Sequence, residues 1–313
     1  FSHVAEDALE RYANRSRLGT EQRKEKIHEL ITADLIRRDK ELQKTPGGGA
    51  CETVVKLLSL GHGESVLRNI VSGPLDADKQ DYLLRDSRFC GVPYGLFDIH
   101  QLHSSFVLGG PQHDRGLWVN RDGVHAVEQY VLAKYYLTTM VYRHQVRLIT
   151  DQMITRAIVL GIEDDNLEEL RSLYSYDGTD QFLDTYVKWD DARFFFCFGD
   201  EVSRGKKSWE MLDRLRSRRL LKQVFSERVA EFVESDVRDR LPKLSTLECD
   251  ALRSELETDV ANLLERELKV DVDPRMVVVF AFDIRSVRTT SRDDESSIMV
   301  QTPQSPRPFE EES

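Results

Sequence analysis

The sequence predicts a mainly α-helical protein with a small β-containing piece near its C-terminus. Up to about Leu268, apolar side chains recur in many segments with the helical period of about 3.6 residues. One segment, MVVVFAFDI (276–284), is continuously apolar and rich in β-branched residues, as expected of a buried strand. After Thr289 the composition turns to Ser, Pro, Gln and acidic residues, which predicts a disordered tail.

Apolar spacing and breakers together define the helices. Ser2 can cap the first helix, and the run TPGGG (45–49) is a strong breaker that ends the second. Helices are predicted at about residues 2–14, 21–42, 50–60, 63–71, 128–160, 165–176, 180–197, 207–220 and 248–266.

Two turn signals lie in the middle of the chain. The Gly-Pro pair at 73–74 stops one element, and Asp76 is placed to cap the helix that follows. Further on, an Asp-Gly pair lies between the alternating residues of LWVNRDGVHAV (117–127), which predicts a small β-hairpin there.

The composition excludes several classes of protein. Hydrophobic residues make up 40% and charged residues 32%, as in globular chains. The net charge of −11 argues against nucleic acid as a partner. No apolar run approaches the roughly 20 residues of a membrane-spanning helix, and no signal peptide is recognisable, so we expect a cytoplasmic protein, or a nuclear one in a eukaryote, without a membrane partner. The scattered cysteines indicate reduced thiols: Cys51, Cys90, Cys197 and Cys249.

One predicted helix carries a polar face of unusual chemistry. At about 100° per residue, four of its side chains fall within one arc. They are Asp78, Lys79, Tyr82 and Asp86. Two carboxylates, an ammonium and a phenol on one face could hold a metal ion and its bound phosphates. The alternative is a solvated helix face with pairs four residues apart, such as Asp81 with Arg85.

This helix lies within a longer segment, GPLDADKQDYLLRDSRFCGVPYGLFD (73–98). It closely resembles the segment that supplies the last metal ligand in HD-domain deoxynucleoside triphosphate (dNTP) triphosphohydrolases. That segment has the pattern D-x-D-[KR]-x-D-Y-x-x-R-D, followed by Gly and then F-D, and every position is matched. The resemblance implies the second half of an HD-domain helical core. It also implies Asp78 as a metal ligand, Lys79 and Tyr82 as phosphate or sugar contacts, and Asp86 as the residue that holds the deoxyribose.

Two shorter matches agree with this resemblance. The first three residues, Phe-Ser-His, resemble the FSH that follows the metal-binding HD doublet in the family, which implies that His3 contacts phosphate and that Glu6 is an acidic catalytic-site residue. His28 and Glu29 resemble the family's HE pair, in which the His is the proton donor to the leaving alkoxide. Imidazole suits that task because its pKa lies near neutrality.

A third match lies in EQYVLAKYYLTTMVYRHQV (128–146). On a regular helix Lys134, Thr138 and Tyr142 share one face. The resemblance implies that Lys134 reaches a terminal phosphate and that Tyr142 packs on the sugar. Many relatives have Arg at the Lys134 position, and several have His where this chain has Thr138. Three other tyrosines of this segment are assigned to core packing: Tyr130, Tyr135 and Tyr136.

An HD site also needs an upstream His and an adjacent His-Asp doublet, and no such pattern precedes Asp78. We attribute the dipeptide at 113–114 to chance, because it lies in a Gly/Pro-rich loop without the flanking pattern. We therefore expect the C-terminal part of a longer protein, inactive by itself. Its expected segments are 1–160 as the C-terminal portion of the HD domain, 161–268 as a helical extension, 269–289 as a strand-containing segment and 290–313 as a disordered tail.

For the complete protein, the resemblance implies hydrolysis of a dNTP, with dGTP a candidate, to a deoxynucleoside and triphosphate. The implied cofactor is a divalent metal (Mn, Mg, Fe or Zn), and the implied assembly is a homo-oligomer. Two alternatives stay open. One is another HD phosphohydrolase, acting on nucleotide monophosphates or cyclic diesters, and the other is a non-catalytic nucleotide-binding or scaffold subunit.

A basic segment interrupts this acidic chain at residues 204–228, with nine basic and three acidic side chains. A solvated helix face is the simplest interpretation. The alternatives are a site for a regulatory nucleotide, a contact between subunits and direct binding of nucleic acid.

Overall fold

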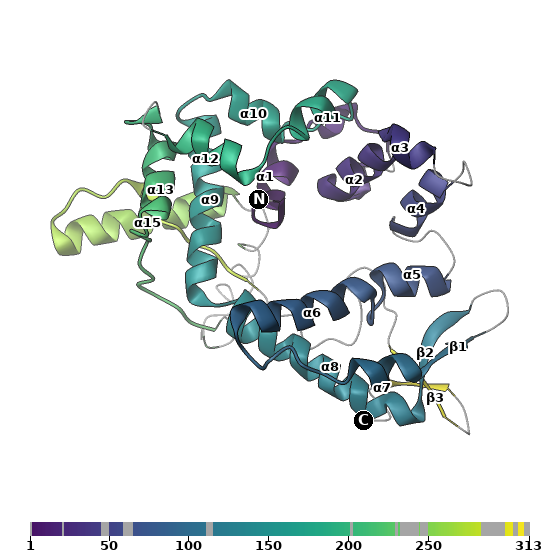
Figure 1. The fold of residues 1–313 in the computed structure, drawn as a ribbon. Helices are drawn as coiled ribbons and strands as arrows, with labels where there is room; N and C mark the ends of the chain where they lie inside the picture. Colours follow the sequence, from purple (N-terminus) through teal and green to yellow (C-terminus); the bar gives the residue numbers. More distant parts are fainter. Residues whose placement is uncertain are drawn as a thin grey trace. The chain divides into compact units, whose positions relative to one another are not determined.

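The computed structural model is mainly helical with a small sheet, which confirms the predicted fold class (Figure 1). It describes residues 2–20, 22–44, 50–58, 65–110, 115–200, 203–228, 231, 244, 250–282, 298–302 and 306–309. The chain divides into two compact units. The first unit comprises residues 1–31 and 145–283, and the second unit comprises residues 32–144 and 284–313.

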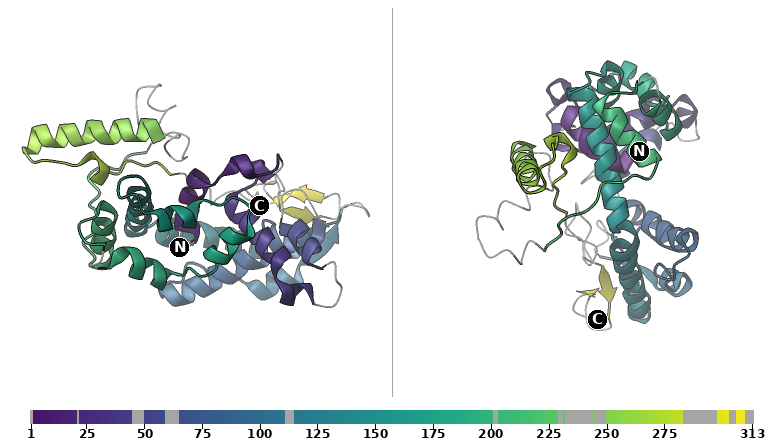
Figure 2. Two further views of the ribbon diagram at one scale, coloured as in Figure 1. Left: turned by 90° about the horizontal axis from the view of Figure 1, so that it is seen from above. Right: turned by 90° about the vertical axis from the view of Figure 1, so that its left-hand side faces the viewer.

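Helix α9 organises the first unit. Thr155–Ile162 form an uninterrupted buried stretch of α9, and α1, α10 and α13 pack against this helix (Figure 2, where α9 is teal and α13 green). The helices of this unit are α1 (Ser2–Tyr12), α9 (Gln145–Glu163), α10 (Glu168–Tyr174), α11 (Asp180–Tyr186), α12 (Asp191–Gly199), α13 (Lys207–Arg216) and α15 (Asp250–Leu268). Helix α2 (Ile27–Arg38) begins in the first unit and continues in the second.

The second unit combines helices with a four-stranded sheet. Its helices are α3 (Lys40–Gln43), α4 (Ala50–Leu58), α5 (Ser65–Ser72), α6 (Ala77–Cys90), α7 (Ile99–Ser104) and α8 (Val124–Leu137). Its strands are β1 (Phe106–Gly109), β2 (Gly116–Asn120), β3 (Met299–Gln301) and β4 (Pro306–Pro308). Helices α6 and α8 pack together, and Leu83, Tyr130 and Leu137 lie buried in their shared core. No helix in the described part of the chain is long and apolar enough to cross a membrane.

The sheet has the strand order β1-β2-β3-β4. Strands β1 and β2 are antiparallel, β2 and β3 are parallel, and β3 and β4 are antiparallel. Val119 of β2 is paired with Val300 of β3, and both side chains are fully buried. The hairpin predicted at 117–127 is therefore wrong. Residues 116–120 pair with β1, and Arg121–Gly123 form a 3-10 turn that leads directly into α8.

The strand predicted at 276–284 is also wrong for its described residues. Pro274–Met276 form a 3-10 turn, and residues 277–282 belong to no strand. Apolar β-branched composition suits a strand, but a strand also needs a partner for its backbone groups. The polar tail supplies strands instead. Ile298 and Phe309 are buried there, so the prediction of disorder is wrong for residues 298–302 and 306–309.

The helix predicted at 128–160 is two helices. Helix α8 ends at Leu137, residues Thr138–Tyr142 form a π-helical turn, and α9 begins at Gln145. The Thr139 hydroxyl donates a hydrogen bond to the carbonyl of Tyr135 at 2.9 Å, a contact that bends helices.

Capping side chains divide two other predicted helices. Asp39 accepts hydrogen bonds from two backbone N–H groups and starts α3 within the predicted helix 21–42. Asp190 caps α12 in the same way within the predicted helix 180–197.

Candidate functional site

The N-terminus of α6 is built around Asp76. This buried carboxylate caps the helix by accepting a hydrogen bond from the Lys79 backbone N–H at 2.7 Å, as the sequence predicted. The Lys79 ammonium forms an ion pair with the same carboxylate and donates to the carbonyl of Gly73 at 3.1 Å. Lys79 thus holds the start of α6, and its contact with phosphate stays a prediction.

The structure brings three sequence-predicted residues together in the second unit. Tyr142, in the π-helical turn, donates a hydrogen bond to Oδ2 of Asp86 at 2.7 Å. The rings of Tyr82 and Tyr142 meet edge to face, with centroids 5.9 Å apart. Arg85 donates to the other oxygen of Asp86 at 3.3 Å. Both oxygens of Asp86 therefore have donors, and one of these donors, Tyr142, is itself packed against the ring of Tyr82.

The two phenols of this group are neutral at physiological pH. Burial raises the pKa of Tyr82 to about 12, and the nearby carboxylates of Asp76, Asp78 and Asp86 act in the same direction. Burial also raises the pKa of Tyr142, as does its hydrogen bond to Asp86. Each tyrosine therefore keeps its proton and can serve as a hydrogen-bond donor.

The remaining predicted residues of the second unit are Asp78 and Lys134. Asp78 is exposed on α6, and Lys134 is half-buried in the last turn of α8. The π-helical turn that follows Leu137 has wider spacing than an α-helix, so the regular helical face on which Lys134 and Tyr142 were aligned does not extend through it.

The described residues alone do not make a metal site. No group of three His, Cys, Asp or Glu side chains among them could hold a metal ion. Asp78 offers one carboxylate, which binds a divalent ion weakly by itself. The side chain of His3 and the dipeptide at 113–114 lie outside the described residues.

A second set of predicted residues meets in the first unit. Nδ1 of His28 lies 3.7 Å from a carboxylate oxygen of Glu6, and Nε2 lies 4.0 Å from one of Glu29. The backbone N–H of Ile27 donates to Glu10 at 2.7 Å, which fixes the start of α2 against α1. An imidazole with a carboxylate near each nitrogen, still about one-third exposed, can carry out acid–base chemistry.

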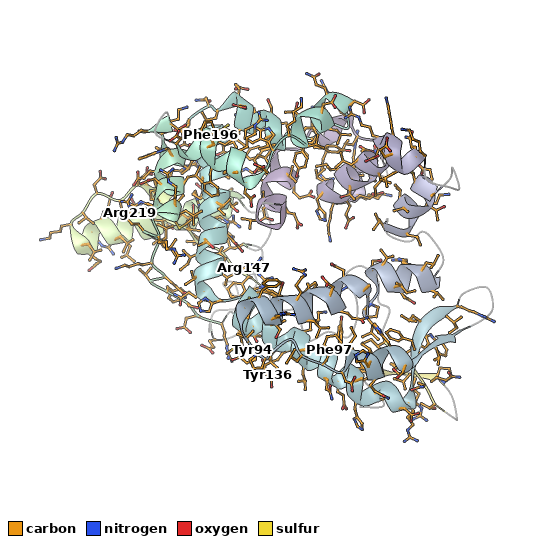
Figure 3. All side chains as sticks on the ribbon, in the orientation of Figure 1. Tyr94, Phe97, Tyr136, Arg147, Phe196 and Arg219 are labelled. Atoms are coloured by element: carbon orange, nitrogen blue, oxygen red, sulfur yellow. The ribbon has the colours of Figure 1, made fainter. Side chains whose placement is uncertain are left out.

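The basic segment 204–228 is partly neutralised from within. Glu210 pairs with Arg214 at 3.0 Å, and Asp213 pairs with Arg216 and Arg219 at 3.6 and 2.5 Å (Figure 3 labels Arg219). These pairs agree with a solvated helix face. A regulatory nucleotide, a subunit contact or nucleic acid at this segment stays a prediction.

The three tyrosines assigned to core packing differ in their burial. Tyr130 is buried and its ring meets that of Phe97 edge to face, which confirms the assignment. Tyr135 and Tyr136 are exposed, so the assignment is wrong for them. Tyr136 lies beside Tyr94 on the surface, with ring centroids 6.3 Å apart (Figure 3).

Sequence reasoning missed a group of arginines and carboxylates around α9. Its most buried pair joins Arg156 of α9 to Glu257 of α15, across 101 residues of sequence. One signal was available, because Arg156 interrupts the apolar run MITRAIVLGI (153–162). A charged side chain on a buried stretch needs a partner.

Comparisons with known proteins agree with this architecture. The family model described as HD associated region matches residues 110–313. The uncharacterized protein YwfO of Bacillus subtilis is 26% identical over 179 residues, which are 55% of this chain and 40% of that protein. An uncharacterized protein of Methanocaldococcus jannaschii is 34% identical over 99 residues, which are 32% of this chain and 22% of that protein. The matched segments thus span less than half of either relative.

A solved structure covers the whole chain. The crystal structure of a phosphohydrolase from Bacteroides thetaiotaomicron matches 100% of this chain and 70% of that protein, with a TM-score of 0.63 and 18% sequence identity. At this identity the likeness concerns the fold. Since the family model matches more than half of the residues, the chain belongs to the HD-associated region family, and it shares its fold with this phosphohydrolase.

Proposed function

We propose that the natural full-length protein is an HD-type phosphohydrolase that hydrolyses a dNTP to a deoxynucleoside and triphosphate. The observation that carries the proposal is the hydrogen bond from Tyr142 to Asp86, with the ring of Tyr82 beside it. These are the residues that the resemblance assigns to the sugar of the substrate. The family and the fold of a phosphohydrolase support the same reaction class.

The group suits a deoxyribose for two physical reasons. The apolar ring faces and edges of Tyr82 and Tyr142 can pack against the carbon skeleton of the sugar. A carboxylate accepts a hydrogen bond from a sugar hydroxyl, and such a charge-assisted bond is stronger than a neutral one. Tyr142 and Arg85 already donate to Asp86, and these bonds fix its orientation before substrate binds.

His28 is the proposed proton donor to the departing 5′-oxygen. The carboxylates of Glu6 and Glu29 lie 3.7 and 4.0 Å from its two nitrogens, so an acidic side chain stands beside each end of the ring. Asp78 is the proposed protein ligand of a divalent metal. The other proposed contacts are those of His3, Lys79 and Lys134 with the phosphates.

A substrate panel on the natural full-length protein tests this function. The panel contains the four dNTPs, the matching ribonucleotides, deoxynucleoside monophosphates and cyclic diesters, each with manganese or magnesium. We expect turnover of dNTPs, with kcat/KM at least roughly tenfold above that of ribonucleotides, because a 2′-hydroxyl packed against the tyrosine rings would lose its hydrogen bonds to water.

Two outcomes would contradict the proposal. Preferred turnover of monophosphates or cyclic diesters would assign the protein to a different HD phosphohydrolase class. Saturable dNTP binding without turnover of any substrate would instead assign it a non-catalytic nucleotide-binding role.

A further inference from the structure

The first unit contains a cavity of about 290 Å³ between α1, α9, α15 and the turn at Pro274–Met276. We infer that this cavity is a binding site for a small phosphate-bearing anion. Its lining includes four arginines and two glutamates: Arg11, Arg156, Arg253, Arg275, Glu163 and Glu257. None of them belongs to the residues assigned above to dNTP hydrolysis.

One wall of the cavity is held by a buried ion pair. Arg156 of α9 pairs with Glu257 of α15, and both side chains are at least 90% buried. Glu257 also accepts a hydrogen bond from the backbone N–H of Val279 at 3.1 Å. This carboxylate therefore ties together α9, α15 and the segment after the 3-10 turn, so the wall is formed before any ligand binds.

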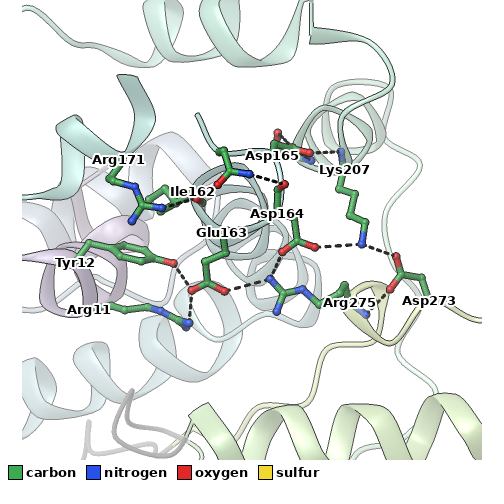
Figure 4. Close-up of polar contacts among 12 residues, drawn as sticks. Arg11, Tyr12, Ile162, Glu163, Asp164, Asp165, Arg171, Lys207, Asp273 and Arg275 are labelled. Carbon is green, nitrogen blue, oxygen red and sulfur yellow. Dashed lines mark hydrogen bonds and ion pairs between the residues drawn. The ribbon is translucent and has the colours of Figure 1, made fainter. Parts of the chain in front are cut away.

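Glu163 positions two further arginines of the cavity (Figure 4). It accepts hydrogen bonds from Arg11 at 2.5 Å, Tyr12 at 2.8 Å and Arg275 at 3.2 Å. Burial by itself raises the pKa of Glu163, but these donors outweigh burial and hold its pKa below the ordinary value. The carboxylate is thus ionised at neutral pH and holds Arg11 and Arg275 at the cavity.

Two arginines of the cavity have a buried donor without an acceptor among the described residues. The Nε–H groups of Arg253 and Arg275 are both buried and lack an acceptor among those residues. Arg253 donates through Nη2 to the carbonyl of Leu244 at 2.6 Å, a neutral acceptor. Each guanidinium carries five N–H donors, so an added anion would supply acceptors that the site lacks.

Donor geometry and size select the ligand class. The lining holds four guanidinium groups and two carboxylates, while Asp164 outside the lining pairs with Arg275 at 2.5 Å and Asp7 lies near Arg253. Planar guanidinium groups bind phosphate oxygens in a bidentate fork. A volume of about 290 Å³ lies at the lower end for ligand cavities, and it suits a pyrophosphate or a small nucleotide better than a larger cofactor. Gln152, Thr155 and Ser254 add polar side chains for orientation.

Calorimetric titration of the natural full-length protein with sodium pyrophosphate tests the site. We expect saturable binding that weakens roughly tenfold or more in Arg253→Gln, because a charge-assisted contact is lost. Arg266→Gln is the matched control on the same helix, because Arg266 is exposed and lies outside the lining. The affinity of this variant for pyrophosphate should equal that of wild type. Arg253→Lys keeps the charge but lacks the planar fork of donors, so its affinity for pyrophosphate should lie between those of wild type and Arg253→Gln.

A second variant distinguishes a loss of binding from a folding defect. It is needed because Arg253 also donates a hydrogen bond to the carbonyl of Leu244. Ala251→Phe fills the cavity without changing any charge and should abolish pyrophosphate binding while thermal unfolding without ligand stays close to wild type. Sulfate at matched ionic strength controls for general screening. Titration with a deoxynucleoside diphosphate distinguishes a nucleotide ligand, which binds more tightly than pyrophosphate, from an inorganic one, which does not.

The site is separable from the proposed active site. Asp86→Asn should impair dNTP turnover and leave pyrophosphate binding intact. Pyrophosphate binding that is equal in wild type, Arg253→Gln and Ala251→Phe would overturn the inference. So would binding that is lost in Asp86→Asn, or no saturable binding at millimolar pyrophosphate. None of these three results depends on which substrate is turned over.

Discussion

Tyr142 donates a hydrogen bond to Asp86 across 2.7 Å, although 56 residues separate them in sequence. The bond joins the π-helical turn after α8 to the middle of α6, and the edge-to-face contact of Tyr82 with Tyr142 supports it. A π-helical turn within a helix frequently marks a functional site. Here the turn places a neutral phenol against an oriented carboxylate.

Replacing Tyr142 by Phe tests this relationship. The ring and its contact with Tyr82 remain, but Asp86 loses the donor that orients it. We expect KM for the preferred dNTP to rise about tenfold, corresponding to roughly 1.4 kcal/mol, with a smaller change in kcat. Tyr136→Phe removes a hydroxyl from an exposed tyrosine of α8 and should leave both constants unchanged. Equal kinetics for the two variants would exclude a role for the hydrogen bond in substrate binding.

Asp76 should dominate the stability of α6. Asp76→Ala removes the helix cap and leaves the partly buried Lys79 ammonium without its ion-pair partner. We expect the free energy of unfolding to fall by about 2–4 kcal/mol. Asp81→Ala on the same helix removes an exposed pair with Arg85 and should change it by about 0.5 kcal/mol or less. Urea unfolding measures both variants, and similar losses would contradict the special role of Asp76.

Gly95 is required by close packing. A Cβ at this position would lie 2.1 Å from the carbonyl oxygen of Leu83 and 2.6 Å from a methyl group of Leu137. Because the first of these atoms is backbone, Gly95→Ala should destabilise the protein by roughly 2–4 kcal/mol. Gly91 instead has a φ of +67° and open space around it, so Gly91→Ala should cost only about 1 kcal/mol. The reverse order in thermal unfolding would refute this packing.

The lowered pKa of Glu163 predicts how the free energy of unfolding depends on pH. Its folded-state pKa lies below the ordinary value of 4.5, so it stabilises the fold above that value and loses this contribution as pH falls through the folded pKa. Glu163→Gln should therefore lower the free energy of unfolding by about 1–2 kcal/mol at neutral pH. The difference from wild type should shrink as the pH falls below 4.5. A difference that stays constant down to acidic pH would show that the charge of Glu163 does not stabilise the fold.

The sequence allowed local features to be predicted where one side chain determines them. The cap at Asp76 and the pair of Asp81 with Arg85 follow from spacing alone, and both are present. The break after Leu137 was missed because its apolar period continues into α9, while the hydroxyl of Thr139 and the π-helical turn change the backbone locally.

Long-range pairing was harder to predict than local structure. The strand at Met299–Gln301 lies in a polar tail, and it forms because Val300 reaches a buried position beside Val119. The apolar run 276–284 has the better strand composition, yet its described residues pair with no strand. Likewise, the motif residues Glu6 and His28 could be named from the sequence, but their 3.7 Å approach depends on the packing of α1 with α2.

Analysis of the reaction products tests the central claim most directly. The natural full-length protein is incubated with a dNTP and manganese, and the products are followed by phosphorus NMR and chromatography. The account predicts inorganic triphosphate and deoxynucleoside in equal amounts, loss of this activity in Asp78→Ala, and its retention in Asp81→Ala, which removes another exposed carboxylate of α6. Release of orthophosphate or pyrophosphate with a deoxynucleotide, or full activity in Asp78→Ala, would contradict it.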